Sequence, residues 1–540
     1  MHWWPILTLL GWAQVHGELF TSSVGLQKLL EDYAAIKQRL LPYLQTQEQR
    51  LHQLHRLTSE RARQIEAGQW EDPLSQYRQL QDAVAFAASA QRLMQEPANL
   101  TRPQLSSASS LDLKGAAAAL FRLQDTYNLS AETLAQGRLP GAPPQEDSNN
   151  TALLTADDAF QLAQTAAQDS DHYHALQWLL LANRRRSESH SFKASSLYHQ
   201  LAQSAAQQGN PEWAVYYARL LHSLEPSYPE AADNLRLYEM AMRNASSIWD
   251  GKLETLPALV NERDNRTAHP RCEALCRGEN LKAPELFCYR QRSSAFSFLA
   301  PFKVEVLHLR PHILLIHEAL SEAEADHLQA IASPKLQRAK VLGQESEGGD
   351  EEEEDEHEYV SDYRVAQNMW IEDKDDALVA AVSQRTAAFT GLSIDSSESL
   401  QIANYGIGGH FQPHYDMTTY DVGPDSDHYE EYGNRIATIL FYLNVPVSGG
   451  ATVFEELGLA IRPIARAAVF WLNLDKIGTP VLDTRHAACP VLYGHQWVAN
   501  KWLHAAGQEL LRPCHLSKRR RWDPIVLAPW RPSLPTHFRL

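Results

Sequence analysis

One stretch, QIANYGIGGHFQPHYD at Gln401–Asp416, constrains the chain more than any other, because it sets an imidazole and a carboxylate two residues apart after a glycine-rich turn. In an extended segment successive side chains alternate between two faces, so His414 and Asp416 project to the same side. One nitrogen ligand and one oxygen ligand on one strand predict a divalent metal site. Two protein ligands seldom hold a catalytic metal, and His486 in DTRHAACPV is the best candidate for the third.

Two histidines and one carboxylate form the facial triad of non-haem iron(II) oxygenases, which leaves one face of the coordination octahedron open. Zinc hydrolases use the same ligand types, so the triad alone does not identify the metal. An isolated H-x-D pair also has an ordinary interpretation, as two polar residues on a solvated strand. The surrounding sequence decides among these interpretations.

The run from NYGIGGHFQPHYD through GNRIATILFYL, SGGATVFEELG and TRHAACPVL to ANKWLHAAGQE closely resembles the catalytic domain of the collagen prolyl 4-hydroxylase alpha subunit. More loosely, the resemblance covers nearly the whole chain. It implies an iron(II)- and 2-oxoglutarate-dependent dioxygenase that hydroxylates peptidyl proline while 2-oxoglutarate is decarboxylated to succinate. In that family His414, Asp416 and His486 would hold the iron, and L-ascorbate would restore overoxidised iron.

Length, charge and the first residues bound the class of protein. A chain of 540 residues predicts about three domains. The net charge of −17 argues against nucleic acid as a partner. Met1–Gly17 is apolar but too short to span a bilayer, so it predicts a cleaved signal peptide, and no later stretch is apolar enough to insert into a membrane. Five N-x-S/T sequons fit a secreted glycoprotein; they lie at Asn99, Asn128, Asn149, Asn244 and Asn265.

The first half of the chain shows helical patterns. Apolar residues recur at steps of three and four from Leu26 to Tyr43, with Ser22 or Ser23 as a cap. An intramolecular helix pair explains this pattern, whereas the resemblance, clearest in LKGAAAALFRLQDTYNLS, implies a region that joins two alpha subunits. Further on, alanines twelve residues apart recur in two helical pairs, which predicts tetratricopeptide-like repeats.

The second half shows short strand-like runs from Lys303 onward, separated by a helical stretch at Ser321–Ala332. Many short strands that carry metal ligands fit a double-stranded β-helix, the jelly-roll class. The acidic run Glu345–Glu358 predicts a solvated, disordered loop. We expect a signal peptide (1–17), a helical dimerisation region (18–136), a linker (137–150), a tetratricopeptide-like peptide-binding domain (151–242), a connecting segment (243–299), a jelly-roll dioxygenase domain (300–515) and a basic, disordered tail (516–540).

In the family that the chain resembles, the repeat domain forms a groove floored with tyrosines, which suits proline-rich chains because their extended helix presents flat rings. The chain departs from that pattern in LYHQLAQSAAQQG, where Gln200, Gln203 and Ala206 stand at the tyrosine positions. The identity of the peptide is therefore open. The remaining candidates for peptide contacts are Tyr173, Tyr198, Tyr216, Tyr217 and Tyr238.

A second departure concerns the cosubstrate. The family binds the distal carboxylate of 2-oxoglutarate with a lysine ten residues after the second histidine, and Gln496 replaces it here. An amide still donates a hydrogen bond, but without charge assistance. His495 would compensate if it were protonated or turned inward by a bulge. The hydroxyls of Tyr405, Thr438 and Tyr442 are candidates for the same pocket, and His504 matches a family histidine that assists cosubstrate binding and decarboxylation.

Five cysteines are few for a disulfide scaffold, and one must be left over. The family pattern implies the pairs Cys276–Cys288 and Cys489–Cys514, with Cys272 free or competing with Cys276. The leading hypothesis is an alpha-subunit-like prolyl 4-hydroxylase of the endoplasmic reticulum lumen, with protein disulfide isomerase as beta subunit, a second alpha subunit and a proline-rich peptide substrate. The alternatives are a non-catalytic or weakly active peptide-binding subunit and a hydroxylase of a non-collagen secreted peptide.

Overall fold

The computed structural model describes residues 22–27, 30–31, 33, 72–94, 109–142, 154–186, 190–245, 249–263, 268–282, 287–292, 295–343, 357–419 and 431–514. The predicted signal peptide, most of the acidic run, the second half of the predicted linker (143–150) and the predicted tail lie outside these residues. The chain divides into two compact units. One spans Asp32–His269, and the other combines Glu18–Glu31 with Pro270–Leu540. No helix in the described ranges is long and apolar enough to cross a membrane.

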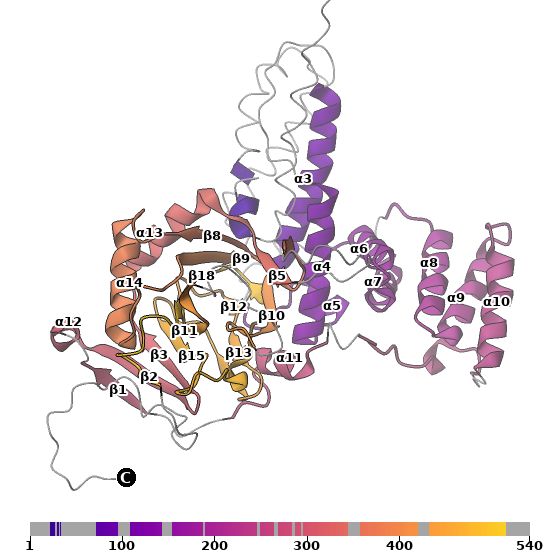
Figure 1. Cartoon of the computed structure of the whole chain (residues 1–540). Helices are drawn as coiled ribbons and strands as arrows, with labels where there is room; N and C mark the ends of the chain where they lie inside the picture. The colour runs from indigo at the N-terminus through magenta and orange to yellow at the C-terminus, as the bar shows by residue number, and fades with distance from the viewer. Residues whose placement is uncertain are drawn as a thin grey trace, which may run out of the picture. The chain divides into compact units, whose positions relative to one another are not determined.

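The first unit is helical (Figure 1). Thr155 begins one helix with a capping box, in which its hydroxyl accepts the N–H of Asp158 and the Asp158 carboxylate accepts the N–H of Thr155. The alanines of the predicted repeats are at most 3% exposed, so the helices approach closely and the repeat prediction is confirmed; they are Ala163, Ala175, Ala202 and Ala214. The helices are α3 (Pro73–Met94), α4 (Ser110–Tyr127), α5 (Ala131–Ala135), α6 (Ala156–Gln168), α7 (His172–Arg184), α8 (Ala194–Gln207), α9 (Pro211–Leu224) and α10 (Ala231–Asn244).

A buried imidazole links α4 to α7. His174 lies between two carboxylates, with its Nδ1 2.7 Å from Asp171 and its Nε2 3.3 Å from Asp125. Burial alone would lower the pKa of His174, but hydrogen bonds to the two aspartates outweigh burial and raise it to about 9. The imidazolium is therefore the resident form at neutral pH. Arg263 lies 3.6 Å from Asp125 on the other side.

This pair of contacts predicts a pH dependence of stability. Because the folded pKa lies above the ordinary value of 6.5, the stabilisation is fully present below about pH 6.5 and is lost as pH rises through 9. The shift corresponds to roughly 3 kcal/mol. Thermal unfolding of wild type and His174→Asn at pH 6 and pH 10 tests this expectation. The wild type should lose more stability between the two values than the variant, and equal losses would contradict the assignment.

The second unit is a double-stranded β-helix, as predicted. Both main sheets are antiparallel (Figure 1). In spatial order the larger sheet contains β1 (Cys288–Gln291), β2 (Phe302–Leu309), β3 (His312–His317), β15 (Ala468–Leu472), β11 (Arg435–Tyr442), β18 (Gln496–His504), β9 (Leu400–Tyr405), β8 (Gln367–Ile371) and β4 (Gln337–Arg338). The smaller sheet contains β14 (Leu459–Ile461), β13 (Thr452–Phe454), β16 (His486–Ala488), β10 (His410–His414) and β7 (Arg364–Val365). Two short pairs complete the strands: β12 (Ser448–Gly449) with β17 (Val491–Tyr493), and β5 (Lys340–Gly343) with β6 (His357–Val360).

The larger sheet separates two apolar cores. On its outer face, side chains such as Ile402 and Ile439 pack against α13 (Glu322–Ala332) and α14 (Ala377–Thr390). On its inner face, side chains such as Tyr405 and Trp471 pack against the smaller sheet. Because successive strand residues alternate, each position on the sheet is committed to one core or the other. Two short helices, α11 (Pro270–Cys276) and α12 (Ala295–Leu299), complete this unit.

The first described residues of the chain belong to this second unit. Asn404 on β9 is fully buried, and its Oδ1 accepts hydrogen bonds from Ser22 Oγ (2.8 Å), Ser23 N (3.0 Å) and Ser23 Oγ (3.1 Å). Ser22 Oγ also accepts the N–H of Val24, which fits the predicted cap of a helix that begins here. The outer face of the catalytic sheet is therefore completed by residues almost 400 positions earlier in the sequence.

The disulfide prediction is wrong. Cys276 bonds to Cys489, with the Cα atoms 5.6 Å apart, while Cys288 and Cys514 are unpaired and exposed. The physical reason is the packing of α11, which buries Cys272 and Leu275 against β13 and β16 and so brings Cys276 to the end of β16. Cys272 is free and buried, and burial raises the pKa of its thiol to about 12.

Breaking this bond should destabilise the second unit. The bond closes a loop of 213 residues, and loss of a disulfide of this kind costs about 2–5 kcal/mol. We expect Cys276→Ser to lower the free energy of unfolding by that amount, measured by denaturant titration, whereas Cys288→Ser should have little effect. Peptide mapping without reduction should recover Cys276 joined to Cys489. A peptide that joins Cys276 to Cys288 would restore the family pattern.

Candidate metal centre

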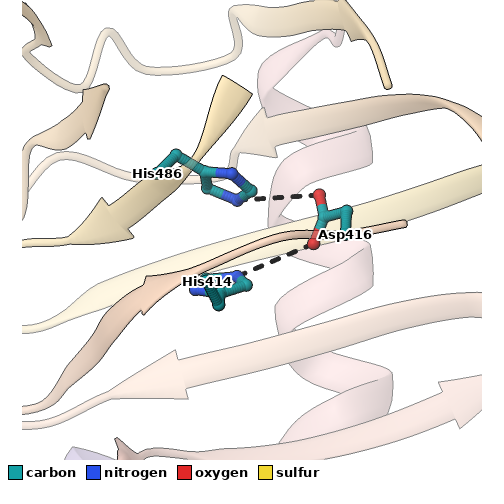
Figure 2. A group of neighbouring side chains, drawn as sticks. All are labelled: His414, Asp416 and His486. Atoms are coloured by element: carbon teal, nitrogen blue, oxygen red, sulfur yellow. Dashed lines mark ion pairs between the residues drawn. The ribbon is translucent and has the colours of Figure 1, made fainter. Parts of the chain in front are cut away.

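The three predicted metal ligands converge between the two sheets (Figure 2). His414 ends β10 and His486 begins β16, and the two residues are direct partners in the register of these strands. A register shift between Phe411 and His414 marks an irregularity before the metal ligands. One ligand atom from each of the three residues lies within 4.8 Å of the others. Nε2 of His414 and Nε2 of His486 each lie 3.6 Å from an oxygen of Asp416.

Backbone carbonyls orient both imidazoles. The Nδ1 of His414 lies 2.7 Å from the carbonyl oxygen of Gln412, and the Nδ1 of His486 lies 3.0 Å from that of Thr484. With each Nδ1–H donating to a carbonyl, the Nε2 lone pair of each ring faces the centre, which is the arrangement that metal-binding histidines require. Burial and the neighbouring His486 lower the pKa of His414 to about 3, so this ring is neutral at physiological pH.

The carboxylate ligand is held by a relay of hydrogen bonds. Thr438 Oγ1 donates to Asp416 Oδ2 at 2.8 Å, and it accepts from Asn473 Nδ2 at 2.9 Å. Burial alone would raise the pKa of Asp416, but the two histidines and the Thr438 hydroxyl hold it below its usual value. Thr438 was predicted to line the cosubstrate pocket, and the structure directs its hydroxyl to the metal ligand. Nothing in the local sequence around Asn473 signals its place in this relay.

His504 lies in a charged network beside the triad. Its Nε2 is 2.9 Å from Glu398 Oε1, and its Nδ1 contacts the carbonyl oxygen of Gly433. Glu398 also pairs with Arg435, which outweighs burial and lowers the pKa of Glu398 to about 2. Arg435 in turn donates to the backbone oxygen of Asp416 at 3.3 Å. Glu398 and Arg435 were missed by sequence reasoning, because only the strand register brings them together.

Gln496 begins β18 and is 4% exposed. Tyr405 is its direct partner on β9. On its other side the glutamine lies over Gly450, where a Cβ atom would come 2.3 Å from Gln496 Oε1, so only glycine fits there. The hydroxyl of Tyr442 bonds to Thr452 at 2.7 Å, and burial raises its pKa. Three of the predicted pocket residues are therefore buried between the sheets, and all three side chains are neutral.

Two basic residues stand close to Gln496 in the sequence, His495 just before β18 and Lys501 within it. Neither supplies the positive charge of the family lysine. Burial lowers the pKa of His495, which disfavours the protonated form that compensation would require. Lys501 stands five positions after Gln496 and so on the opposite face of the strand, where its ammonium lies 3.3 Å from Asp373. The lysine is 2% exposed and lies on the outer face of the sheet.

The donor set around the triad fits a ligand rich in oxygen atoms. Trp471, whose ring lies 4.8 Å from that of His486, has a buried Nε1–H without a hydrogen-bond partner among the described residues. Trp502 Nε1 and Arg364 Nε are also buried and have no hydrogen-bond partner among the described residues. Buried donors of this kind are rare unless a ligand or water completes them. With two imidazoles and one carboxylate as ligands, the residues fit iron(II), and the donors fit a 2-oxo acid.

The predicted peptide-binding tyrosines separate into a cluster and two outliers. Tyr217 lies between Tyr198 and Tyr216, with ring centroids 6.0 and 5.0 Å away. The two outliers are elsewhere in the helical unit: Tyr173 packs against His174, and Tyr238 is 8% exposed. Tyr217 is 2% exposed, so the cluster presents little of its central ring to a ligand.

Three stretches of the chain match known protein families. Residues 400–504 match the "2OG-Fe(II) oxygenase superfamily", residues 22–141 the "Prolyl 4-Hydroxylase alpha-subunit, N-terminal region", and residues 156–244 the "Prolyl 4-hydroxylase peptide-substrate-binding domain". A solved viral collagen prolyl hydroxylase from Paramecium bursaria Chlorella virus-1 is 23% identical, with a TM-score of 0.27, over 35% of this chain and 94% of that one.

Two curated relatives match along nearly their whole length. Prolyl 4-hydroxylase subunit alpha-2 of Caenorhabditis elegans is 34% identical over 93% of this chain and 94% of the relative. Prolyl 4-hydroxylase subunit alpha-1 of Homo sapiens is 33% identical over 96% of this chain and 100% of the relative. The His-Asp-His group lies within residues 400–504, which match the oxygenase family model. The chain belongs to the prolyl 4-hydroxylase alpha-subunit family of iron(II)- and 2-oxoglutarate-dependent dioxygenases.

Proposed function

We propose that the chain hydroxylates peptidyl proline in secretory proteins, with iron(II) held by His414, Asp416 and His486, 2-oxoglutarate as cosubstrate and L-ascorbate as reductant. The observation that carries this proposal is the convergence of three oriented ligand atoms in a family of proline hydroxylases. When bound, iron and 2-oxoglutarate supply the activation of oxygen. The protein supplies ligand orientation, a water-poor interior and hydrogen-bond donors.

Individual residues take separate parts in this proposal. Thr438 and Asn473 fix the carboxylate of Asp416, so the ligand does not rotate when the metal binds. Glu398 fixes His504, which we propose assists cosubstrate binding. Gln496 and Tyr405, with Tyr442 behind them, receive the distal carboxylate of 2-oxoglutarate by neutral hydrogen bonds.

We further propose that the chain works in the endoplasmic reticulum lumen, with protein disulfide isomerase as beta subunit and a second alpha subunit. The relatives are named as subunits, which supports an assembly. The disulfide between Cys276 and Cys489 supports an oxidising compartment, because thiols in the cytosol are kept reduced. The predicted signal peptide agrees with the same compartment.

Succinate formation tests the activity. The assembled protein is supplied with iron(II), 2-oxoglutarate and ascorbate, with and without the peptide (Pro-Pro-Gly)5, and both succinate and 4-hydroxyproline are measured. We expect the two products in equal amounts and only slow succinate formation without peptide. Succinate without hydroxyproline, at any peptide concentration, would exclude peptidyl proline as the substrate. Absence of both products would favour a non-catalytic subunit.

A further inference from the structure

A single asparagine holds the backbone on both sides of Gln496. Nδ2 of Asn444 donates a hydrogen bond to the carbonyl oxygen of His495 at 3.1 Å, and its Oδ1 accepts one from the N–H of Trp497 at 2.7 Å. One planar amide therefore fixes the residue before Gln496 and the residue after it. Because the backbone of a strand decides the face to which each side chain points, this contact directs the Gln496 side chain between the sheets.

A second asparagine contacts Gln496 from the neighbouring strand. Asn404 lies on β9 one position before Tyr405, the direct partner of Gln496, and its Nδ2 donates to the carbonyl oxygen of Gln496 at 3.5 Å. The Oδ1 of the same amide accepts the N–H of Ser23 and the hydroxyls of Ser22 and Ser23. A backbone N–H can only donate, so this contact assigns the oxygen of the amide to the serines and its NH2 group to Gln496.

These groups form a buried chain from the first described residues of the protein to the backbone of Gln496. Asn404, Ser22 and Ser23 are all buried. Next to them, Val24 packs against the outer core of the oxygenase unit. Without the serine hydroxyls, two of the three hydrogen bonds to Oδ1 of Asn404 are lost, and an amide released from its partners on one side is free to turn away from the partner on the other.

A neutral side chain at position 496 depends on this support more than a lysine would. The ammonium of a lysine is a compact charge on a flexible stem, and it attracts a carboxylate over a range of positions. An amide binds through a neutral hydrogen bond, which weakens steeply as its angle departs from linear. Gln496 also has little room to adjust, because it lies directly over Gly450. The affinity of this site for a carboxylate therefore depends on where the backbone holds the glutamine.

We propose that Asn404 is a positioning residue for the cosubstrate, and that Ser22 and Ser23 keep it in place. Asn404 on β9 and Asn444, which follows β11, approach β18 from its two neighbouring strands. The segment of the chain ahead of the helical unit thereby takes part in 2-oxoglutarate binding. The inference rests on the proposed function, because that function places the distal carboxylate of 2-oxoglutarate at Gln496.

The test uses the full-length assembled protein loaded with manganese(II) under anaerobic conditions, and isothermal titration calorimetry measures the binding of 2-oxoglutarate. We expect Asn404→Ala to weaken this binding roughly three- to tenfold, the range that follows from loss of one neutral hydrogen bond. The double substitution Ser22→Ala and Ser23→Ala should weaken it about two- to fivefold, because the N–H of residue 23 remains. In the iron-loaded enzyme the Michaelis constant for 2-oxoglutarate should rise by the same factors, with turnover unchanged.

Two controls separate positioning from a general loosening of the fold. Ser383→Ala removes a buried hydroxyl of α14 that donates to Asp373 at 2.7 Å, and it should leave the affinity for 2-oxoglutarate unchanged. In the Gln496→Lys background, Asn404→Ala should weaken binding less than it does in the wild type, because a flexible ammonium depends less on its backbone. The affinity for manganese(II) of the asparagine and serine variants should equal that of the wild type.

The outcomes separate this inference from the proposed function. If the wild type binds 2-oxoglutarate and Asn404→Ala binds it equally well, the positioning role is wrong while the proposed function stands. Equal losses in Asn404→Ala and Ser383→Ala, or an equal effect of Asn404→Ala in both backgrounds, would also overturn the positioning role. If Asn404→Ala does not fold, the double serine variant decides, and an unchanged affinity in that variant overturns the inference. A wild type that binds manganese(II) but not 2-oxoglutarate overturns the proposed function and the inference together.

Discussion

Replacing Gln496 with lysine is expected to lower the Michaelis constant for 2-oxoglutarate roughly five- to thirtyfold, with little change in turnover. A charge-assisted hydrogen bond contributes about 1–2 kcal/mol more than a neutral one, and each 1.4 kcal/mol is about a factor of ten. Gln496 is buried beside Tyr405 and above Gly450, and neither neighbour carries an acid that would compete for an ammonium at this position. Uniform binding gained in this way lowers the Michaelis constant alone.

The same substitution has a second readout that does not depend on activity. A buried ammonium without a partner is unfavourable, so Gln496→Lys should melt at a lower temperature than the wild type in the absence of ligand. Addition of 2-oxoglutarate with manganese(II), under anaerobic conditions, should raise the melting temperature of the variant more than that of the wild type. Gln496→Leu is the control, since it adds no charge and removes the amide. A lysine variant that binds 2-oxoglutarate more weakly than the wild type would show that a cation already occupies the distal end of the pocket.

Replacing Asp416 with alanine should abolish both metal binding and turnover. Asp416 is the only carboxylate of the triad, so the site loses its only anionic ligand. The threonine that holds this carboxylate provides a graded companion. Thr438→Val keeps the side-chain shape, removes the hydrogen bond to Asp416 and should weaken metal affinity about 10–100-fold, the usual effect of losing a hydrogen bond to a metal ligand.

Manganese(II) titration followed by electron paramagnetic resonance measures these affinities without turnover. Thr390→Val is the matched control, because Thr390 is also a buried threonine with a bonded hydroxyl, but its partner is a carbonyl oxygen of α14. It should change stability and leave metal affinity unaltered. If Thr438→Val and Thr390→Val bind manganese(II) equally well, the relay from Asn473 through Thr438 does not tune the metal ligand.

The sequence predicts the parts of the structure that depend on short spacing. His414 and Asp416 share a face because strands alternate, and the paired alanines of the repeats mark close helix contacts wherever the helices are placed. Contacts between distant segments are different. Cys276 finds Cys489 because α11 packs on the smaller sheet, and that choice depends on tertiary packing that neither motif contains. The family pattern implied a bond between Cys276 and Cys288, whereas the packing of α11 places Cys276 next to Cys489.

The same distinction explains the residues around the metal centre. His504 carries a recognisable motif, whereas its partner Glu398 is one acidic residue among many until β18 and the segment before β9 are placed together. Thr438 illustrates a subtler limit. Its position between the sheets follows from strand alternation, but the direction of its hydroxyl depends on whether Asp416 or Gln496 is within reach, and only coordinates decide that.

The contact between Ser22, Ser23 and Asn404 changes how the chain's connectivity is understood. Since Glu18–Glu31 and Pro270–Leu540 form one unit, the segment Asp32–His269 is an insertion within the oxygenase, and the chain enters it after Glu31 and leaves it before Pro270. A protease that cuts at one of these two junctions alone therefore leaves the polypeptide joined through the other. Expression of the oxygenase from residue 270 onward would omit a native segment of its own outer core, and an internal deletion that joins Glu31 directly to Pro270 would keep it.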